Sequence, residues 1–469
     1  MRYKLPMKET AALTLGTLLE GLALGENKRR QILDLSRNLA RRREITLEKI
    51  LQHPELETCF QHKTLSPADK YKKGVQLLKN WLKESGQNQT SVTNRRPYSR
   101  LSTSRPKRIW IEAAVRDSHM TRQILERLPE VPFEVVEEVQ TLKHPTDFTD
   151  AKKQWLLAQH KGKSLKTCQA KSPAFLCCNY WTLTFSSNCP LECSYCILQS
   201  YLKNNPITTI YTNMEEILGE VTTLTQAHPK RRFRIGTGEL ADSLAMESFT
   251  GQAAMAVEFF ANLPNAVLEL KTKSVEIETL LSLEHKEKTV ISWSVNPEVV
   301  IASEEFKTAS LTERLKAAER TANAGYGIGF HFDPIVIQQE AGETWLKEYQ
   351  QLLERILDTV PNEKIRWISF GALRFPADLK QHAEERFPKT KIYTDPAFQR
   401  HNGKFHYAPE LRQKVYETLW PMAAKALGKE KLYLCMEPSS TWKAVDPEPQ
   451  TNEAIESRLL RLPSISAPK

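Results

Sequence analysis

The sequence predicts an α/β fold whose centre is a parallel sheet curved into a partial barrel of six strand–helix units. Two observations predict this fold. Strand-like and helix-like segments alternate regularly between residues 179 and 385, and such alternation is typical of a parallel sheet. Polar residues also gather where the predicted strands end, which is the edge that carries the active site in barrels of this kind.

Each unit pairs a short apolar segment with an amphipathic one. The predicted strands are residues 181–187, 231–238, 266–273, 289–295, 327–335 and 364–373. The predicted helices are residues 214–228, 248–263, 275–285, 310–325, 344–360 and 377–385, where apolar residues recur at three- and four-residue spacing. We therefore assign residues 179–385 to the barrel and residues 109–178 to a small α/β lead-in.

The segments outside this body differ from it in composition. We expect several short helices in residues 1–85, a flexible basic linker in residues 86–108, a C-terminal extension in residues 386–445 and a disordered tail in residues 446–469. Residues 11–25 are apolar, but Glu20 interrupts them, so an amphipathic helix is expected there rather than a signal peptide.

Positive charge is concentrated at the N-terminal end. Residues 1–108 hold 23 Lys and Arg against 10 Asp and Glu, whereas the whole chain holds 66 against 56. This asymmetry predicts an appendage that binds a polyanion, although a basic region kept for solubility is the alternative. Between residues 389 and 407 basic and aromatic residues alternate, which suits contact with phosphates and bases or, equally, an ordinary cap on the barrel.

Three closely spaced cysteines are the most informative motif. Cys189, Cys193 and Cys196 have the spacing C-x3-C-x2-C, which can hold three corners of a [4Fe-4S] cluster and leave the fourth iron open to a small molecule. A structural zinc site normally needs four ligands, and a disulfide framework suits small secreted domains better than a chain of 469 residues. An oxygen-sensitive cluster, and the lack of any apolar run near the ~20 residues of a membrane span, predict a cytoplasmic protein without membrane contact.

The cysteine loop resembles that of the radical S-adenosylmethionine (SAM) enzymes, and further motifs resemble the spore photoproduct lyase family, whose members are DNA-repair-photolyase-like. The matching pieces are CSYCILQSYL, KTKSVEIETLL, SWSVNP, RLKAAERTANAGYGIGFHFDPI and RFPKTKIY, within residues 109–442. The resemblance implies a partial (β/α)6 barrel of the radical SAM type.

Family roles transfer to individual positions of this chain. The resemblance implies that Cys189, Cys193 and Cys196 ligate the cluster. It implies a SAM site made of strand-end and loop residues: Tyr195 near the adenine, Gly238 and Glu239 at the amino group, Lys273 at the carboxylate, Ser294 and Asn296 at the ribose, and Asp242 and Asp333 serving SAM or substrate.

Two positions depart from the family pattern. The lyases carry a hydrogen-donor cysteine where this chain has Thr237, and a tyrosine after the third cluster cysteine where this chain has Ile197. An alcohol O–H bond is too strong to replace a thiol as the donor. Cys435 is therefore a candidate substitute donor, and Tyr326 or Tyr201 a candidate relay, although buried structural roles are the commoner alternative for such residues.

The sequence thus predicts an enzyme that cleaves SAM to a 5′-deoxyadenosyl radical and acts on damaged DNA, with a thymine dimer as the expected lesion. An electron donor such as flavodoxin or ferredoxin is expected as a partner. Two alternatives remain open at this point: a radical SAM enzyme for RNA, a protein or a small molecule, and a non-catalytic iron–sulfur protein that binds nucleic acid.

Overall fold

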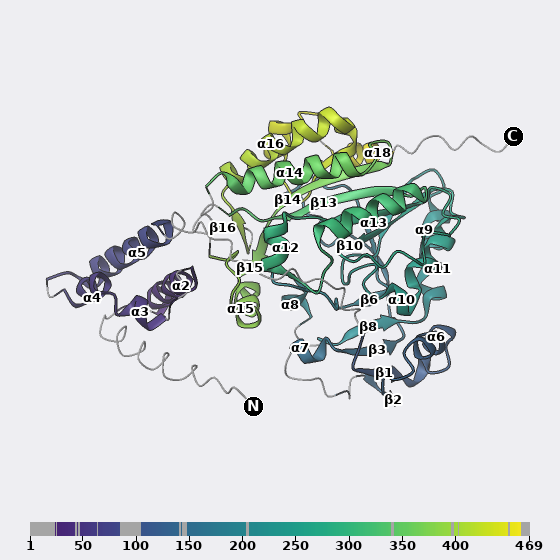
Figure 1. Cartoon of the computed structure of the whole chain (residues 1–469), viewed down its shortest axis with the longest axis horizontal. Helices are drawn as coiled ribbons and strands as arrows, with labels where there is room; N and C mark the ends of the chain where they lie inside the picture. The colour runs from purple at the N-terminus through teal and green to yellow at the C-terminus, as the bar shows by residue number, and fades with distance from the viewer. Residues whose placement is uncertain are drawn as a thin grey trace. The chain divides into compact units, whose positions relative to one another are not determined.

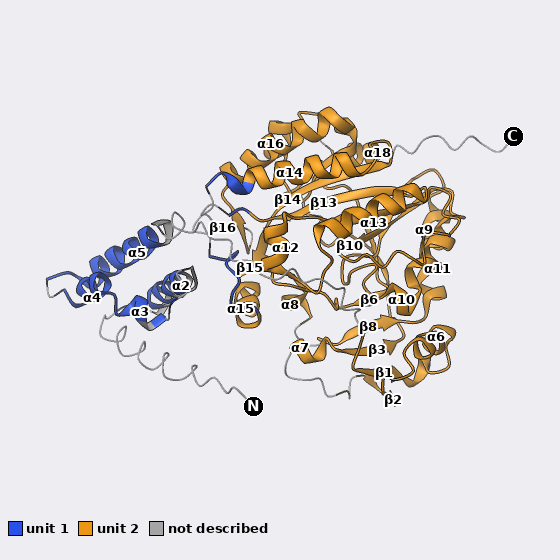
Figure 2. Ribbon diagram, in the orientation of Figure 1, with its two compact units in different colours: residues 1–94, 337–345, 387–398 blue, residues 95–336, 346–386, 399–469 orange. Residues whose placement is uncertain are grey.

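The computed structural model describes residues 24, 26–42, 45, 47–62, 64–84, 105–139, 142, 148–202, 206–338, 342–394, 398–401, 403–448 and 451–460. It divides into two compact units (Figure 2). The first comprises residues 1–94, 337–345 and 387–398, and the second comprises residues 95–336, 346–386 and 399–469. The predictions for residues 11–23, for most of the 86–108 linker and for residues 461–469 lie outside the described residues. Within the described part of the chain, no helix is both long and apolar enough to span a bilayer.

The second unit is built on an eight-stranded sheet in the order β18-β14-β13-β11-β10-β9-β5-β4. Figure 1 labels β14, β13 and β10 of this sheet. The strands are β4 (Leu165–Thr167), β5 (Trp181–Leu183), β9 (Phe233–Gly236), β10 (Ala266–Thr272), β11 (Thr289–Ser294), β13 (Gly327–Ile335), β14 (Ile365–Ala372) and β18 (Leu432–Leu434). All neighbours are parallel except β4, which runs antiparallel to β5. Each of the six predicted strands contributes a strand to this sheet, so the α/β partial-barrel prediction is confirmed.

One hydrogen bond shows how strongly the sheet curls. Four strands separate β9 from β18 in the sheet order. Nevertheless, Arg234 on β9 donates to the Tyr433 hydroxyl on β18 at 2.8 Å. Between them, Glu269 on β10 accepts hydrogen bonds from Arg234 (3.0 Å), His331 on β13 (2.8 Å) and Trp367 on β14 (2.9 Å). A flat sheet would hold these strands apart, because neighbouring strands lie ~4.8 Å from each other.

The helices of this unit lie between these strands along the chain and pack around the sheet. They are α9 (Met214–Ala227), α10 (Glu247–Thr250), α11 (Gln252–Phe260), α12 (Glu298–Glu304), α13 (Leu311–Asn323), α14 (Thr344–Thr359) and α15 (Ala377–Arg386). α13 packs against β11 and β13, and α11 packs against β10. A capping box fixes the start of α13, because the Ser310 hydroxyl accepts from the Glu313 amide while the Glu313 carboxylate accepts from the Ser310 amide.

The predicted helix at residues 275–285 is wrong. The segment forms successive tight turns, in which the Ile277 amide donates to the Val275 carbonyl and the Leu280 amide to the Ile277 carbonyl. Ile277 and Leu280 are both fully buried, so the turns serve the same apolar spacing that suggested a helix. The β-branched Val275, Ile277 and Thr279 lower the helical preference of this stretch.

A second, smaller sheet combines three strands that precede the barrel sheet in the chain with two that follow its strand β5. Its order is β2-β1-β3-β8-β6, with β1 (Arg108–Glu112), β2 (Phe133–Val136), β3 (Gln154–Ala158), β6 (Ser186–Ser187) and β8 (Thr208–Tyr211). β6 is antiparallel to β8, and the other pairs are parallel. Helix α6 (His119–Arg127) begins at Ser118, whose hydroxyl accepts from the Thr121 amide, and the short helix α7 (Phe148–Ala151) comes just before β3.

The C-terminal part extends the barrel and corrects one prediction. α16 (Pro409–Leu427) packs against β14 and β18, and α17 (Ser439–Val445) packs against α16. Residues 446–469 were expected to be disordered, but α18 (Asn452–Leu459) is a helix capped by Thr451. Its Glu456 carboxylate accepts from Asn179 at 2.9 Å and from Arg231 at 3.0 Å. The proline-rich surroundings masked the cap and the apolar pair Ile455 and Leu459, which are spaced as on one helix face.

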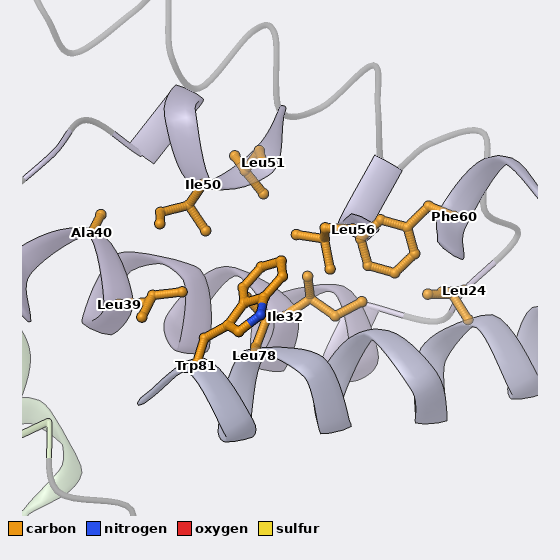
Figure 3. Close-up of a cluster of buried hydrophobic side chains, with 10 residues drawn as sticks. All are labelled: Leu24, Ile32, Leu39, Ala40, Ile50, Leu51, Leu56, Phe60, Leu78 and Trp81. Carbon is orange, nitrogen blue, oxygen red and sulfur yellow. The ribbon is translucent and has the colours of Figure 1, made fainter. Parts of the chain in front are cut away.

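The N-terminal residues of the first unit form a small helical core (Figure 3). Its helices are α2 (Glu26–Arg42), α3 (Leu47–Leu51), α4 (Pro54–Gln61) and α5 (Pro67–Glu84). Ile32, Leu56 and Leu78 are fully buried in this core, with Phe60 and Trp81 beside them. On α5, Lys72, Lys73 and Lys79 are exposed.

Candidate active site at the carboxyl edge of the barrel sheet

The three cysteines of the motif lie in a loop that the surrounding backbone holds tightly. The short strand β7 (Glu192–Cys193) pairs antiparallel with β12 (Glu305–Phe306), which places Glu305 opposite Cys193. The Gln199 amide, on the short helix α8 (Leu198–Tyr201), donates to the carbonyls of Cys193 (3.3 Å), Ser194 (3.0 Å) and Cys196 (3.3 Å). These hydrogen bonds shape the loop through its backbone carbonyls and do not involve the thiols.

The thiols face a cavity of about 490 Å³ at the carboxyl ends of the strands. Cys189, Cys193 and Cys196 all line it. So do most of the other residues that the sequence singled out, from the loop and from the ends of β9, β10, β11 and β13: Tyr195, Gly238, Glu239, Asp242, Lys273, Ser294 and Asp333. Residues from distant parts of the chain thus meet at one edge of the sheet, as expected for a barrel of parallel strands.

Asp242 connects the ends of two neighbouring strands. Its Oδ1 accepts from the Thr272 hydroxyl at 2.6 Å and from the amides of Leu244 (3.0 Å) and Ala245 (2.9 Å). Its Oδ2 accepts from the Lys273 amide at 2.6 Å. Asp242 therefore fixes the backbone from which Lys273 projects, and this role is separate from any contact with a ligand.

A buried ionic cluster supports Tyr195 and Lys273. The Tyr195 hydroxyl donates to Glu305, and the Lys273 ammonium lies 5.6 Å from the centre of the Tyr195 ring. Arg314 donates to the other Glu305 oxygen at 2.6 Å, and both charged side chains are fully buried. Burial alone would lower the pKa of Lys273, but the nearby Cys193 and Glu305 outweigh it and raise that pKa. Lys273 therefore remains a cation facing the cavity.

Glu305 and Arg314 were missed by the sequence analysis. Arg314 lies inside a motif quoted for the family resemblance, but nothing in the sequence pairs it with Glu305. The one useful signal was Arg314, an ionic residue on the apolar face of the predicted helix 310–325, because such a residue is buried only when it is paired. Glu305 lies on the short strand β12 and gave no such signal.

Asn296 does not line the cavity, although it was predicted to face the ribose. Its amide nitrogen donates to Glu305 at 2.9 Å, and its amide oxygen accepts from the Tyr349 hydroxyl at 2.7 Å. Both groups of the side chain are thus engaged in the structure, and Asn296 acts on the cavity through Glu305.

Tyr326 lies far from the predicted place of a radical relay. It comes just before β13, at the amino end of the strand, and its hydroxyl donates to the Leu280 carbonyl at 2.7 Å. Its ring stacks on His285 and is fully buried. Among the three tyrosines named from the sequence, Tyr195 and Tyr201 line the cavity instead.

Cys435 lies beside the cavity rather than in its lining. It follows β18, and its thiol is 3.6 Å from Nη2 of Arg374, which does line the cavity together with Asp333 and Met436. Burial first, and then Asp333, raise the pKa of Cys435, so the residue is a neutral thiol. Thr237 has no comparable access, because it is buried and its hydroxyl donates to Ser243 at 2.7 Å.

The donor set suits an iron–sulfur cluster better than a single ion. Among the described residues, no three His, Cys, Asp or Glu side chains converge closely enough to hold one metal ion. Each cysteine of a cubic cluster binds a different iron, so its three thiolates need not converge on a point. Burial raises the pKa of Cys189 to about 12 and that of Cys193 further. Iron coordination would supply the positive charge that such buried thiolates need. The residues present therefore fit the cluster.

Three closely spaced thiols at the carboxyl edge of a curled, mostly parallel sheet are the arrangement of the radical SAM class of enzymes. A family model described as spore photoproduct lyase matches residues 105–429. The chain therefore belongs to the spore photoproduct lyase family, which is a family of enzymes.

Curated relatives agree with the family match. The chain is 28% identical over 247 residues to the spore photoproduct lyase of Bacillus subtilis strain 168, covering 51% of this chain and 71% of that protein. It is 25% identical over 327 residues to the enzyme of the same name from Clostridium acetobutylicum, covering 66% of this chain and 93% of that protein.

Solved structures show the same fold. A spore photoproduct lyase complexed with dinucleoside spore photoproduct superposes with a TM-score of 0.61 at 21% identity, over 71% of this chain and 98% of that chain. A mutant of a spore photoproduct lyase with bound AdoMet and dinucleoside spore photoproduct also gives 0.61, at 20% identity, over 70% of this chain and 98% of that chain.

Proposed function

We propose that this chain is a radical SAM enzyme that repairs a thymine lesion in DNA; its curated relatives are named spore photoproduct lyases. The observation that carries the proposal is the meeting of three cysteine thiols, a cationic lysine and three carboxylates, those of Glu239, Asp242 and Asp333, in one cavity of the barrel. When bound, the cluster and SAM would supply a 5′-deoxyadenosyl radical that abstracts a hydrogen from the lesion.

The chain's own residues bind and orient these groups. Cys189, Cys193 and Cys196 would hold the cluster. Lys273 supplies a cation for the SAM carboxylate, and Glu239 supplies an acceptor for its ammonium group, which are the charge signs that SAM requires. Tyr195, Gly238, Asp242 and Ser294 complete the cavity wall around SAM, while Asn296 acts on that wall through Glu305.

A thiol outside the cluster completes the proposed reaction. We assign Cys435 as the hydrogen donor to the lesion radical, since its neutral thiol lies directly behind Asp333 and Arg374, two residues that line the cavity. Donation would leave Cys435 as a thiyl radical, which must regain a hydrogen atom from 5′-deoxyadenosine. Tyr201, which lines the cavity with its side chain largely exposed, is the remaining candidate to relay that hydrogen atom. Ile197 also lines the cavity and cannot relay hydrogen.

The exposed lysines of α5 support nucleic acid as the partner of the N-terminal helical core. Lys72 and Lys79 are seven residues apart and so lie on one face of the helix, next to Lys73. Such a face suits phosphate contacts. A one-electron donor such as flavodoxin or ferredoxin, and a cytoplasmic location, belong to the same proposal.

An anaerobic turnover experiment tests the proposal. The protein is reconstituted with iron and sulfide, reduced, and incubated with SAM and ultraviolet-irradiated DNA, and 5′-deoxyadenosine and restored thymine are followed by mass spectrometry. The proposal expects both products. Formation of 5′-deoxyadenosine without restored thymine would move the enzyme to another substrate, such as RNA, a protein or a small molecule. That outcome has some structural support, because Thr237 and Ile197 stand where the lyases carry a cysteine and a tyrosine.

A further inference from the structure

An ion pair marks the end of the cavity near Cys435. Asp333, on β13, and Arg374, at the start of β15 (Arg374–Pro376), both line the cavity with the three cluster cysteines. Nη1 of Arg374 donates to Oδ1 of Asp333 at 3.3 Å and to the Ala372 carbonyl at 3.0 Å. Each side chain keeps a small exposed fraction, 16% for Asp333 and 14% for Arg374.

Arg374 gives two of its donors to weak acceptors. Its Nε is 2.9 Å from the sulfur of Met436, and its Nη2 is 3.6 Å from the sulfur of Cys435. Thioether and thiol sulfurs accept hydrogen bonds poorly. A carbonyl oxygen entering the cavity would therefore gain a charge-assisted hydrogen bond from Arg374 at little cost in existing bonds.

The neighbouring strand leaves room for the pair. Gly371 lies near the end of β14, and a Cβ atom there would come within 2.9 Å of Oδ1 of Asp333 and 3.2 Å of Nη1 of Arg374. Only glycine lets the carboxylate and the guanidinium lie side by side at this place. The fold therefore places a hydrogen-bond acceptor, Asp333, beside a donor, Arg374, and Gly371 leaves the space that this arrangement needs.

We propose that Asp333 and Arg374 together recognise the imide edge of a pyrimidine base in the lesion. This inference rests on the proposed function. Asp333 would accept the ring N3–H, and Arg374 would donate to an adjacent ring carbonyl. The imide of thymine presents this donor–acceptor pair on its Watson–Crick edge, which is available only when the base has left the duplex. The pair would hold the lesion next to the Cys435 thiol.

The charges of the pair favour a base over a phosphate. Burial alone would raise the pKa of Asp333, but Arg374 and Lys271 lower it, so the carboxylate is ionised. An ionised carboxylate beside Arg374 repels a phosphodiester and attracts a neutral N–H donor.

A methylated ligand tests the inference with the full-length, reconstituted protein. Affinity is measured by calorimetry for dinucleoside spore photoproduct and for the same compound methylated at N3 of both rings. Wild-type protein is expected to bind the methylated compound roughly 10- to 100-fold more weakly, because a hydrogen bond to a charged group is lost. Asp333→Ala should weaken binding of the unmodified compound and abolish the difference between the two compounds. Lys166→Gln, which removes a lining charge away from the pair, should preserve that difference.

Equal affinity of wild-type protein for the two compounds overturns the inference while leaving repair intact, and this comparison needs no variant to fold. If affinity instead follows the presence of an internucleotide phosphate, Arg374 binds phosphate and the inference is wrong. If neither compound binds although SAM is cleaved, the proposed function fails, and the inference fails with it.

Discussion

Arg314 donates to Glu305 at 2.6 Å, and both side chains are completely buried beside the cysteine loop. Glu305 also accepts hydrogen bonds from Tyr195 and Asn296, and it lies opposite Cys193 in the β7–β12 ladder. One carboxylate therefore connects the cluster loop, the cavity wall and helix α13. This arrangement makes Glu305 a positioning residue, although it does not itself line the cavity.

Glu305→Gln should strongly destabilise the protein. The substitution leaves Arg314 as a buried charge without its partner, and breaking such a pair costs about 3–5 kcal/mol. Urea unfolding monitored by fluorescence measures the free energy of unfolding. Glu298→Gln is the matched control, because its pair with Arg355 lies at the surface and is worth about 1 kcal/mol or less. Equal effects of the two substitutions would contradict the assigned role.

The stability of the barrel should fall in mild acid because of His331. Burial first, and then Lys271, lower the pKa of this residue to about 4 from an ordinary value of 6.5. A depressed folded-state pKa means that the unfolded chain binds the proton more readily, so the contribution to stability is complete above pH 6.5 and is lost as pH falls to 4. The loss amounts to ~3 kcal/mol. Urea unfolding across this range should show the dependence in wild-type protein and a weaker one in His331→Gln; identical pH profiles would refute the assignment.

Gly371→Ala should impair lesion turnover without stopping SAM cleavage. The new methyl group would collide with Asp333 and Arg374. These residues lie on β13 and β15, whereas the cluster cysteines lie in the loop that follows β5. Restored thymine and 5′-deoxyadenosine are measured in the same reaction, and their ratio should fall. Gly219→Ala on α9 is the control, because a Cβ there meets nothing within 4 Å. If Gly371→Ala repairs as well as this control, the pair does not position the lesion.

Cys435→Ser should uncouple the two products. The serine hydroxyl cannot donate a hydrogen atom to a carbon radical, so restored thymine should be lost while 5′-deoxyadenosine still forms. Cys59→Ser serves as a comparison, since Cys59 lies in the helical core, where its thiol donates to the Lys70 carbonyl. Unchanged repair by Cys435→Ser would show that another group is the donor.

Replacing Lys72, Lys73 and Lys79 together by Gln should weaken binding to DNA and flatten its salt dependence. Each phosphate contact contributes about 0.9 to the slope of log affinity against log salt for duplex DNA. The control replaces three exposed lysines of the second unit, Lys286, Lys316 and Lys347. Fluorescence anisotropy at several salt concentrations compares the two variants, and equal slopes would remove the N-terminal helices from the DNA-binding surface.

The sheet and the position of its site were predictable because both follow from local patterns. Alternating segments specify parallel strands, and residues such as Lys273 and Ser294 fall at strand ends whatever the side-chain packing. The role of Asn296 was not predictable, because it depends on Glu305 and Tyr349 arriving from other elements. Tyr326 could have been excluded from the sequence, because the predicted strand begins at residue 327, as β13 does. Tyr326 therefore lies at the amino end of the strand, away from the carboxyl edge that carries the site.

Cluster binding is tested by the iron content and the electron paramagnetic resonance of the anaerobically reconstituted protein, with and without SAM. We expect about four irons and four sulfides per chain, and a reduced-cluster signal that changes when SAM is added. Cys189→Ala, Cys193→Ala and Cys196→Ala should each lose the cluster, whereas Cys168→Ala should retain it. Full cluster occupancy in Cys193→Ala, or a signal that SAM leaves unchanged, would show that these three cysteines do not hold a cluster that binds SAM.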